Sequence, residues 1–283
     1  MLYKTSLIVN KRLNIMNKKI GFIGCGKMAS AIIGGVISSK FLNTEDITAS
    51  EHSEEKQIQK QNELGIKVIT DNKQLVKESD VIFVATTPNY VADVLNEIKD
   101  ILNSKKLLVS IAAGVTTEKI EAIVGKSVRV VRVMPNTPAL VLEGMSGVTG
   151  GSSASDDDVN FVIKLLSNIG KAIQVPETQM DIVTAISGSG PAFYYKVIND
   201  IARAGEKLGM DYEKALMLSI QTAIGSAKML LNSDKSAEDL IASVATKGGC
   251  TRVGVDYMEE IDTDNIFFNL IDKTAQKANQ LGK

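Results

Sequence analysis

Residues 21–31, GFIGCGKMASA, decide the fold of this chain. A strand of buried type over 18–24 leads into this stretch, and a helical pattern over 27–39 follows it. Gly24, Gly26 and Ala29 form a G-x-G-x-x-A pattern at the junction. Such a pattern allows a tight turn, a close approach of a pyrophosphate to the backbone, and close packing of helix on strand. Because a helix start also attracts phosphate, the stretch predicts a dinucleotide site more strongly than a plain strand–helix turn.

The alternation of strand and helix continues from this stretch to about Pro176. The predicted strands are 18–24, 46–50, 66–69, 80–86, 106–111, 127–133 and 171–175. The predicted helices between them are 27–39, 54–64, 89–102, 116–124 and 155–170. This order is typical of βαβ units, so we predict an α/β Rossmann domain with a doubly wound, mostly parallel sheet covered on both faces.

The strands stop after Pro176, and the rest of the chain is predicted to be helical. The predicted helices are 191–209, 211–232, 236–245, 252–261 and 263–282, with starts marked by Asp211 and by the Ser236/Asp239 capping pair. Residues 215–231 are too apolar for a singly exposed helix, so they form either a bundle centre or a subunit interface, and we favour the interface. The predicted parts are a disordered extension over 1–16, with Met16 as the natural start, a Rossmann domain over 17–176 and a helical domain over 177–283.

Composition excludes several classes of protein. The 283 residues are 44% hydrophobic and 23% charged, with a formal net charge of -1, so neither nucleic acid nor an anionic membrane is an expected partner. No apolar run reaches the length that spans a membrane. Two cysteines, Cys25 and Cys250, fit a reducing, cytoplasmic location. No metal is expected, because no histidine, cysteine and aspartate cluster has ligand spacing.

Glu51, directly after the second predicted strand, bears on the choice between NADPH and NADH. A carboxylate there accepts hydrogen bonds from a ribose hydroxyl and repels a 2′-phosphate, which favours NADH. Ser50, His52 and Ser53, with Lys56 nearby, could instead hold a phosphate, so the sequence leaves both cofactors open. His52 is the only histidine and is expected at the adenosine end. A protonated imine, which accepts hydride with little acid assistance, is therefore a suitable substrate.

Five motifs, taken in this order and spacing, resemble the pyrroline-5-carboxylate reductase family over nearly the whole chain from about Lys18. They are IGFIGCGKMASAIIGG (20–35), SIAAGVT (110–116), VRVMPNTPALVLEG (131–144), ISGSGPAF (186–193) and KGGCTRVG (247–254). The resemblance implies reduction of 1-pyrroline-5-carboxylate to L-proline by NADPH or NADH, the last step of proline synthesis. It also implies that 177–283 form a dimerisation and substrate domain, in a homodimer whose subunits interleave and which can assemble further into rings.

The resemblance assigns the substrate site to the KGGCTRVG stretch. Gly248 and Gly249 would let backbone N–H groups around Gly249, Cys250 and Thr251 face the substrate carboxylate at a helix start. The Thr251 hydroxyl would lie near the imine nitrogen as proton donor or relay, which makes it the predicted catalytic residue. Val244 matches a position that lines this site. The alternative is a plain glycine-rich helix cap.

The resemblance also extends the cofactor site beyond Gly24, Gly26, Ala29, Ser50 and Glu51. The added residues are Lys27, Met28, Ala85, Thr86, Pro88, Ala112, Asn136 and Ser189. Asn136 is expected to face the nicotinamide and to hydrogen-bond cofactor or substrate, although its neighbours Pro135 and Pro138 could merely shape the loop. Ser189 is expected beside the nicotinamide, or else as the cap of a helix at a domain hinge.

The chain departs from the family pattern at two positions, and three other functions compete with this interpretation. Thr87 stands where the family usually has lysine, and Lys247 where it has proline, which bears on cofactor preference and affinity. A β-hydroxyacid dehydrogenase fails on spacing, because its lysine and asparagine positions counted from Gly190 hold Tyr194 and Ile198. A reductase of another cyclic imine and a catalytically weakened dinucleotide sensor remain alternatives.

Overall fold

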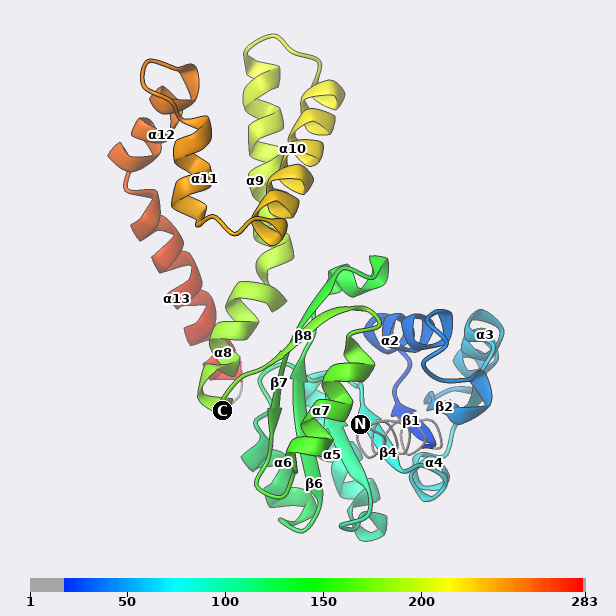
Figure 1. Cartoon of the computed structure of the whole chain (residues 1–283). Coiled ribbons are helices and arrows are strands. Elements are labelled where there is room, and N and C mark those ends of the chain that lie inside the picture. The colour runs from blue at the N-terminus through cyan, green and yellow to red at the C-terminus, as the bar shows by residue number, and fades with distance from the viewer. Residues whose placement is uncertain (1–17, 282–283) are drawn as a thin grey trace, which may run out of the picture. The chain divides into compact units, whose positions relative to one another are not determined.

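The first part of the chain forms one eight-stranded sheet with helices on both faces (Figure 1). The computed structural model describes residues 18–281, so the predicted extension over 1–16 lies outside the described residues. The strands are β1 (Ile20–Ile23), β2 (Ile47–Ser50), β3 (Lys67–Ile69), β4 (Val81–Val84), β5 (Leu107–Ser110), β6 (Arg129–Met134), β7 (Gly144–Gly150) and β8 (Gly170–Gln174). Their order is β3-β2-β1-β4-β5-β6-β7-β8, and each neighbouring pair is parallel except β6 and β7. The predicted doubly wound, mostly parallel sheet is confirmed.

The helices follow the strands in the predicted alternation. Those of the sheet region are α2 (Lys27–Ser38), α3 (Glu54–Leu64), α4 (Asn72–Glu78), α5 (Pro88–Ile98), α6 (Thr117–Val124), α7 (Asp156–Leu166) and α8 (Met180–Val183). Short 3₁₀ turns are η1 (Thr44–Asp46), η2 (Lys99–Ile101), η3 (Thr137–Val141) and η4 (Glu177–Gln179), and η5 (Thr184–Gly188) is a π-helical turn. The later helices are α9 (Gly190–Lys207), α10 (Tyr212–Asn232), α11 (Ala237–Val244), α12 (Cys250–Glu260) and α13 (Thr263–Leu281).

Two apolar layers hold the sheet, one on each face. Helices α2 and α7 pack on the face that carries Phe22 and Phe83, whose rings stack at 4.6 Å between centroids. Helices α4, α5 and α6 cover the other face, which carries Ile82 and Leu108. Central strands such as β1 (IGFI) and β4 (VIFV) are buried along their whole length, which explains why they read as continuous apolar runs.

Strand β7 was not predicted from the sequence, and its glycines explain why. Its sequence, GMSGVTG, contains three glycines, which depress strand propensity. A Cβ on Gly147 would lie 2.6 Å from Cγ1 of Val183, so the glycine lets α8 approach the strand. Strand β7 pairs antiparallel with β6 and packs closely against α8. A glycine that is needed for such packing gives no strand signal in the sequence.

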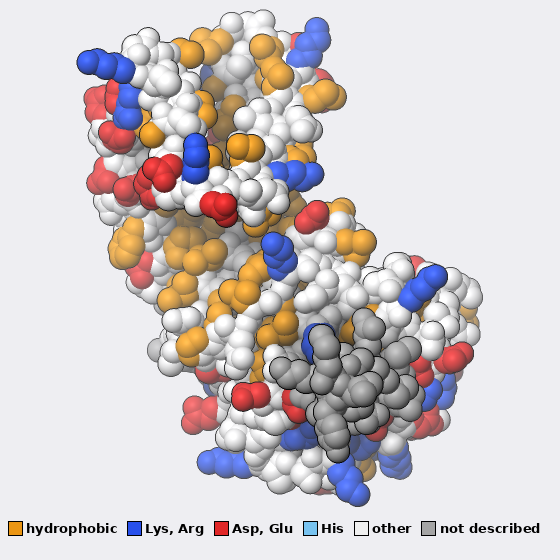
Figure 2. Space-filling model, in the orientation of Figure 1, with side chains coloured by type: hydrophobic (Ala, Val, Ile, Leu, Met, Phe, Trp, Pro, Cys, Tyr) orange, Lys and Arg blue, Asp and Glu red, His pale blue; other side chains and the backbone are white. Residues whose placement is uncertain are grey.

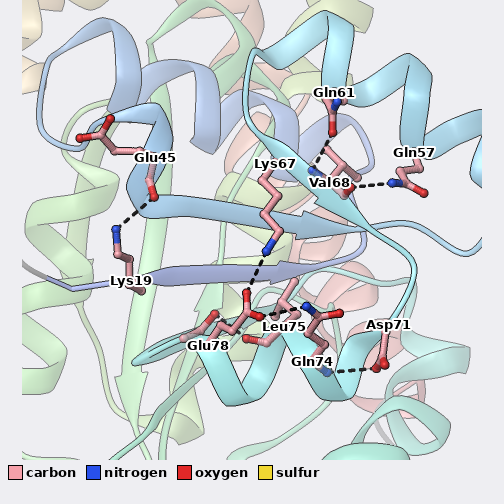
Figure 3. Close-up of polar contacts among 11 residues, drawn as sticks. Lys19, Glu45, Gln57, Gln61, Lys67, Val68, Asp71, Gln74, Leu75 and Glu78 are labelled. Atoms are coloured by element: carbon pink, nitrogen blue, oxygen red, sulfur yellow. Dashed lines mark hydrogen bonds and ion pairs between the residues drawn. The ribbon is translucent and has the colours of Figure 1, made fainter.

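The edge strand β3 has its free side covered by side chains of α3 (Figure 3). Gln57 donates from Nε2 to the Val68 carbonyl at 2.8 Å, and Gln61 Oε1 accepts from the Val68 N–H at 3.4 Å. On the other side of β3, Lys67 pairs with Glu78 of α4 at 2.9 Å. The two glutamine contacts satisfy the backbone carbonyl and N–H of Val68, which would otherwise be open to another strand.

The chain divides into two compact units. The first runs from the start of the described residues to Gly188 and includes the end of α13 from Thr274, so η4, α8 and η5 belong with the sheet. The second is Ser189–Lys273, in which α9 and α10 pack as a helical hairpin. The buried hydrophobic residues of this second unit are three alanines: Ala202, Ala215 and Ala245.

Many large apolar side chains of the second unit are exposed, as Figure 2 shows for α9–α13. They include Tyr194, Ile201, Met217, Leu218, Met229, Leu231, Val253, Tyr257, Ile266 and Phe268. A folded unit of this size needs an apolar core, and three alanines do not supply one. The unit therefore has apolar faces that are available to another surface.

Candidate functional site

Four of the predicted cofactor residues, Gly24, Ser50, Glu51 and Thr86, line one cavity where the order of the strands reverses. Strand β1 lies between β2 and β4, so the chain winds outward from it to both sides. Ligands of such sheets bind beyond the carboxyl ends of the strands at this switch point. A cavity of about 430 Å³ lies there, lined by Ile23, Gly24, Ser50, Glu51, His52, Thr70, Asn72, Thr86, Tyr90 and Val94.

The glycine-rich loop has the geometry that a pyrophosphate requires. Gly24 has a φ of +88°, and a Cβ there would lie 3.0 Å from the Ala85 carbonyl oxygen. No atom lies within 4 Å of a Cβ built on Gly26, so the backbone is open on that side. Gly26 is also the N-cap of α2 and provides no side-chain cap, which leaves the helix start available to an anion. Ala29 is buried against the sheet, as its place in the pattern predicts.

The three other residues of this loop differ in exposure. Lys27 is exposed and Met28 half-buried at the start of α2, where both are accessible to a bound molecule. Cys25 is fully buried, with 0% of its surface exposed. Burial raises the pKa of the Cys25 thiol to about 11, because the charged thiolate loses its solvation. The Cys25 side chain therefore packs inward while its backbone N–H takes part in the loop.

Glu51 reaches back from the end of β2 to this loop. Its Oε1 accepts a hydrogen bond from the Cys25 N–H at 2.9 Å, and its Oε2 lies 3.4 Å from Nδ1 of His52. Ser50 is 1% exposed, and its hydroxyl donates to Oδ1 of Asn72 at 2.6 Å. Both predicted residues thus line the cavity, and the side chains of both are held by contacts within the protein.

Four more predicted cofactor residues follow strands β4 and β5, and their environments differ. Thr86 lines the cavity, and among the described residues its buried Oγ1 has no hydrogen-bond partner. Ala85 donates its N–H to the Ile23 carbonyl at 2.9 Å and so joins β4 to the glycine loop. Ala112, after β5, is buried in the layer under α5 and α6. Pro88 is the first residue of α5, and Thr87, one of the two departures, is its N-cap.

Asn136 bonds to the protein itself through both ends of its amide. Nδ2 donates to the Ser187 carbonyl at 3.0 Å, and Oδ1 accepts from the Met145 N–H at 2.8 Å. The residue is buried and ties the end of β6 to β7 and to the π-helical turn. Its first role is therefore to hold this loop in place. Ser189 is the N-cap of α9, and its side chain makes no capping hydrogen bond.

The predicted substrate residues lie together in the second unit, where α11 leads into α12. Gly248 has a φ of +76°, and Gly249, the N-cap of α12, has no side chain to cap the helix. Cys250 and Thr251 are the first two residues of α12 and are exposed, as is Val244 at the end of α11. The Gly249 N–H, expected to face the carboxylate, instead donates to the Thr246 carbonyl at 3.0 Å, because the chain turns there before the helix. The N–H groups of Cys250 and Thr251 remain at the helix start for a small carboxylate.

Besides the apolar Ile23 and Val94, sequence reasoning missed three residues with hydrogen-bonding side chains that line the cofactor cavity: Thr70, Asn72 and Tyr90. Thr70 directly follows β3, so the rule that located Glu51 after β2 would also have found it. Asn72 could not be found this way, because its role depends on the bond with Ser50. Tyr90 lies in the first turn of α5, where an aromatic residue gives no distinct signal.

The described residues hold neither a metal-binding cluster nor a membrane-spanning helix. Across residues 18–281, no group of histidine, cysteine, aspartate and glutamate side chains is placed to hold a metal ion. Within the same range, no helix combines the length and the apolar character needed to cross a membrane.

Comparisons with known proteins agree with this geometry. Residues 177–281 match the family model for pyrroline-5-carboxylate reductase dimerisation, and residues 19–114 match that for NADP oxidoreductase, coenzyme F420-dependent. The pyrroline-5-carboxylate reductase of Methanosarcina acetivorans is 40% identical over 94% of this chain and 99% of that protein. That of Aquifex aeolicus is 36% identical over 94% of this chain and 98% of its own length.

Solved structures give the same result. A pyrroline-5-carboxylate reductase from Coxiella burnetii matches with a TM-score of 0.89 and 32% identity over 94% of this chain and 99% of that one. One from Plasmodium falciparum, solved with NADP bound, matches with a TM-score of 0.84 and 32% identity over 95% of this chain and 100% of that one. The fold and the glycine loop define a dinucleotide-dependent oxidoreductase with a helical second unit. The chain belongs to the pyrroline-5-carboxylate reductase family.

Proposed function

We propose that this protein reduces 1-pyrroline-5-carboxylate to L-proline with a hydride from NADPH or NADH, the last step of proline biosynthesis. The observation that carries the proposal is the start of α12, where Gly248, Gly249 and Thr251 leave an uncapped helix end beside a hydroxyl. This suits a small cyclic imine that bears a carboxylate. Relatives of this activity match over nearly the whole chain, which supports the assignment.

Some residues of this site would bind the substrate, and Thr251 would supply a proton. Backbone N–H groups of Cys250 and Thr251 would hold the substrate carboxylate, aided by the positive end of the helix. The Thr251 hydroxyl would donate or relay a proton to the imine nitrogen. The bound reduced nicotinamide supplies the hydride that adds to the imine carbon, so the C=N bond becomes CH–NH.

The cofactor residues fit a dinucleotide. The open backbone at Gly26 and the uncapped start of α2 accept the pyrophosphate, and Glu51 borders the adenosine ribose. Asn136 would act here as a positioning residue that holds the loop between β6 and β7. The unpartnered Oγ1 of Thr86 offers a further hydrogen bond to the cofactor.

The proposed assembly is a homodimer, which can associate further into rings. The support is the exposed apolar surface of α9–α13 together with the match of residues 177–281 to a dimerisation family. A second copy of this unit would bury that surface and form the missing core. A cytoplasmic location, which the two free cysteines favour, belongs to the same proposal.

The experiment that tests the function follows the loss of reduced-nicotinamide absorbance after 1-pyrroline-5-carboxylate is added to the purified protein. We expect oxidation of the cofactor and formation of an equal amount of L-proline. A six-membered cyclic imine with the same carboxylate is the matched comparison. Turnover of the six-membered ring alone would assign the enzyme to another imine. Cofactor binding without turnover of either ring would indicate a sensor, with Thr87 and Lys247 the first residues to revert.

A further inference from the structure

We propose that Glu51 makes this enzyme select NADH over NADPH. The proposal rests on the proposed function, because it concerns the cofactor of that reaction. One solved relative, from Plasmodium falciparum, is described with NADP bound. The residues around the cavity of this chain determine its own preference.

The carboxylate of Glu51 is fixed where the adenosine ribose would bind. Oε1 accepts the Cys25 N–H at 2.9 Å, and Cys25 lies between the two glycines of the phosphate loop. The Glu51 side chain is only 12% exposed, so it is held rather than extended into solvent. A carboxylate at the end of the second strand accepts hydrogen bonds from ribose hydroxyls and repels a phosphate on the 2′-oxygen.

Of the two serine hydroxyls that could bind a 2′-phosphate, that of Ser50 is already used as a donor. The Ser50 hydroxyl is buried and donates to Asn72, whose amide in turn donates to Glu97 at 2.9 Å. The Ser53 hydroxyl accepts the Lys56 N–H at 3.4 Å as the N-cap of α3. Ser50 cannot donate to a phosphate without giving up its bond to Asn72, whereas the Ser53 hydroxyl uses only an acceptor site in the cap and keeps its own proton.

The charges near the end of β2 also oppose a 2′-phosphate. Residues 51–56, EHSEEK, contain three glutamates against one lysine and one histidine. Glu54 and Glu55 occupy the first turn of α3, so the positive end of this helix already faces carboxylates. The nearby Lys60 ammonium lies 2.7 Å from Glu63 and 3.3 Å from the Ser30 hydroxyl. A 2′-phosphate would thus add negative charge to a negative region.

The test is a calorimetric titration of the full chain with NADH and with NADPH at one ionic strength. We expect NADH to bind at least ~10-fold more tightly, which corresponds to about 1.4 kcal/mol. Glu51→Gln should bring the ratio of the two dissociation constants toward one, and Glu51→Asp, which keeps the charge, should preserve the preference. The matched control is Glu45→Gln, because Glu45 precedes β2 at the opposite edge of the sheet and should leave the ratio unchanged.

The possible results separate this proposal from the proposed function. If the unaltered protein binds NADPH as tightly as NADH or more tightly, the preference assigned to Glu51 is overturned, while turnover of the imine would still support the function. If neither dinucleotide binds, both proposals fail. An unchanged ratio in Glu51→Gln, or in Glu51→Ala if Glu51→Gln does not fold, would also overturn the assignment of the preference to Glu51.

Discussion

Thr251 is the residue on which the proposed chemistry most depends. It follows two glycines at the start of α12 and is the first hydroxyl on that helix. Proton transfer by a positioned side chain contributes roughly 10²- to 10⁴-fold to many enzymatic rates. A hydroxyl beside an intrinsically reactive iminium should contribute at the lower end of that range.

Replacing Thr251 with valine, which has the same shape and no hydroxyl, should lower kcat by about 100-fold. Thr251→Ser keeps the hydroxyl and is the matched control, for which we expect activity near that of the unaltered enzyme. Steady-state kinetics with saturating cofactor measure both variants, and circular dichroism checks that the helices remain. Unchanged kinetics in Thr251→Val would remove the hydroxyl from the mechanism.

Single residues also show where sequence reasoning reaches its limit. Gly24 and Glu51 could be located because each directly follows a recognisable strand, and Gly26 because it completes the glycine pattern two residues after Gly24. The contacts of Asn136 could not, since its partner Ser187 lies 51 residues away and is brought near only by the fold. Strand ends can be read from a pattern, but hydrogen bonds between distant loops require the structure.

At the scale of elements, the edge strand β3 depends on α3 for its outer hydrogen bonds (Figure 3). Gln57 and Gln61 lie four residues apart, on one side of the helix, and both reach the backbone of Val68. Two amide side chains thus take the place of a neighbouring strand.

Gln57→Ala should lower the free energy of unfolding by about 1–2 kcal/mol, because the Val68 carbonyl loses its partner. The control is Gln59→Ala on the same helix, where the side chain is exposed and a change within about 0.5 kcal/mol is expected. Urea denaturation measures both variants. Equal midpoints for the two variants would show that water replaces the Gln57 bond at no cost.

Elements with strong local signals were predicted, and those with weak signals were missed. The N-caps Asp211 and Ser236 were predicted, and both accept the expected backbone hydrogen bonds. Strand β7 and helix α4 were not predicted, since β7 is rich in glycine and α4 has only seven residues. Short or glycine-rich elements are stabilised by the packing around them rather than by local propensity.

At the scale of the whole molecule, the second unit exposes many apolar side chains and buries few. Met217 on α10 is 73% exposed, while the buried hydrophobic residues of the unit are three alanines. The sequence had pointed to a subunit interface over 215–231 because that helix is apolar on too much of its surface. The exposed side chains agree with that interpretation, and the interface stays a prediction.

Met217→Glu should shift the protein from dimer to monomer, because a carboxylate would have to be buried in the proposed interface. Ile58→Glu on α3 is the matched control, since Ile58 is an exposed aliphatic residue of the sheet unit. Size-exclusion chromatography with light scattering, run over a dilution series, measures the mass of each. A dimer that persists in Met217→Glu would place the interface on another surface.

The burial of Cys25 has a consequence for an enzyme exposed to oxidants. Peroxides react with thiolates, and a thiol whose pKa is raised to about 11 carries almost no thiolate at neutral pH. The sulfur lies inside the phosphate loop yet has no exposed surface. Dinucleotide binding should therefore survive oxidants that would modify an accessible thiol at the same place, whereas the exposed Cys250 at the start of α12 has no such protection.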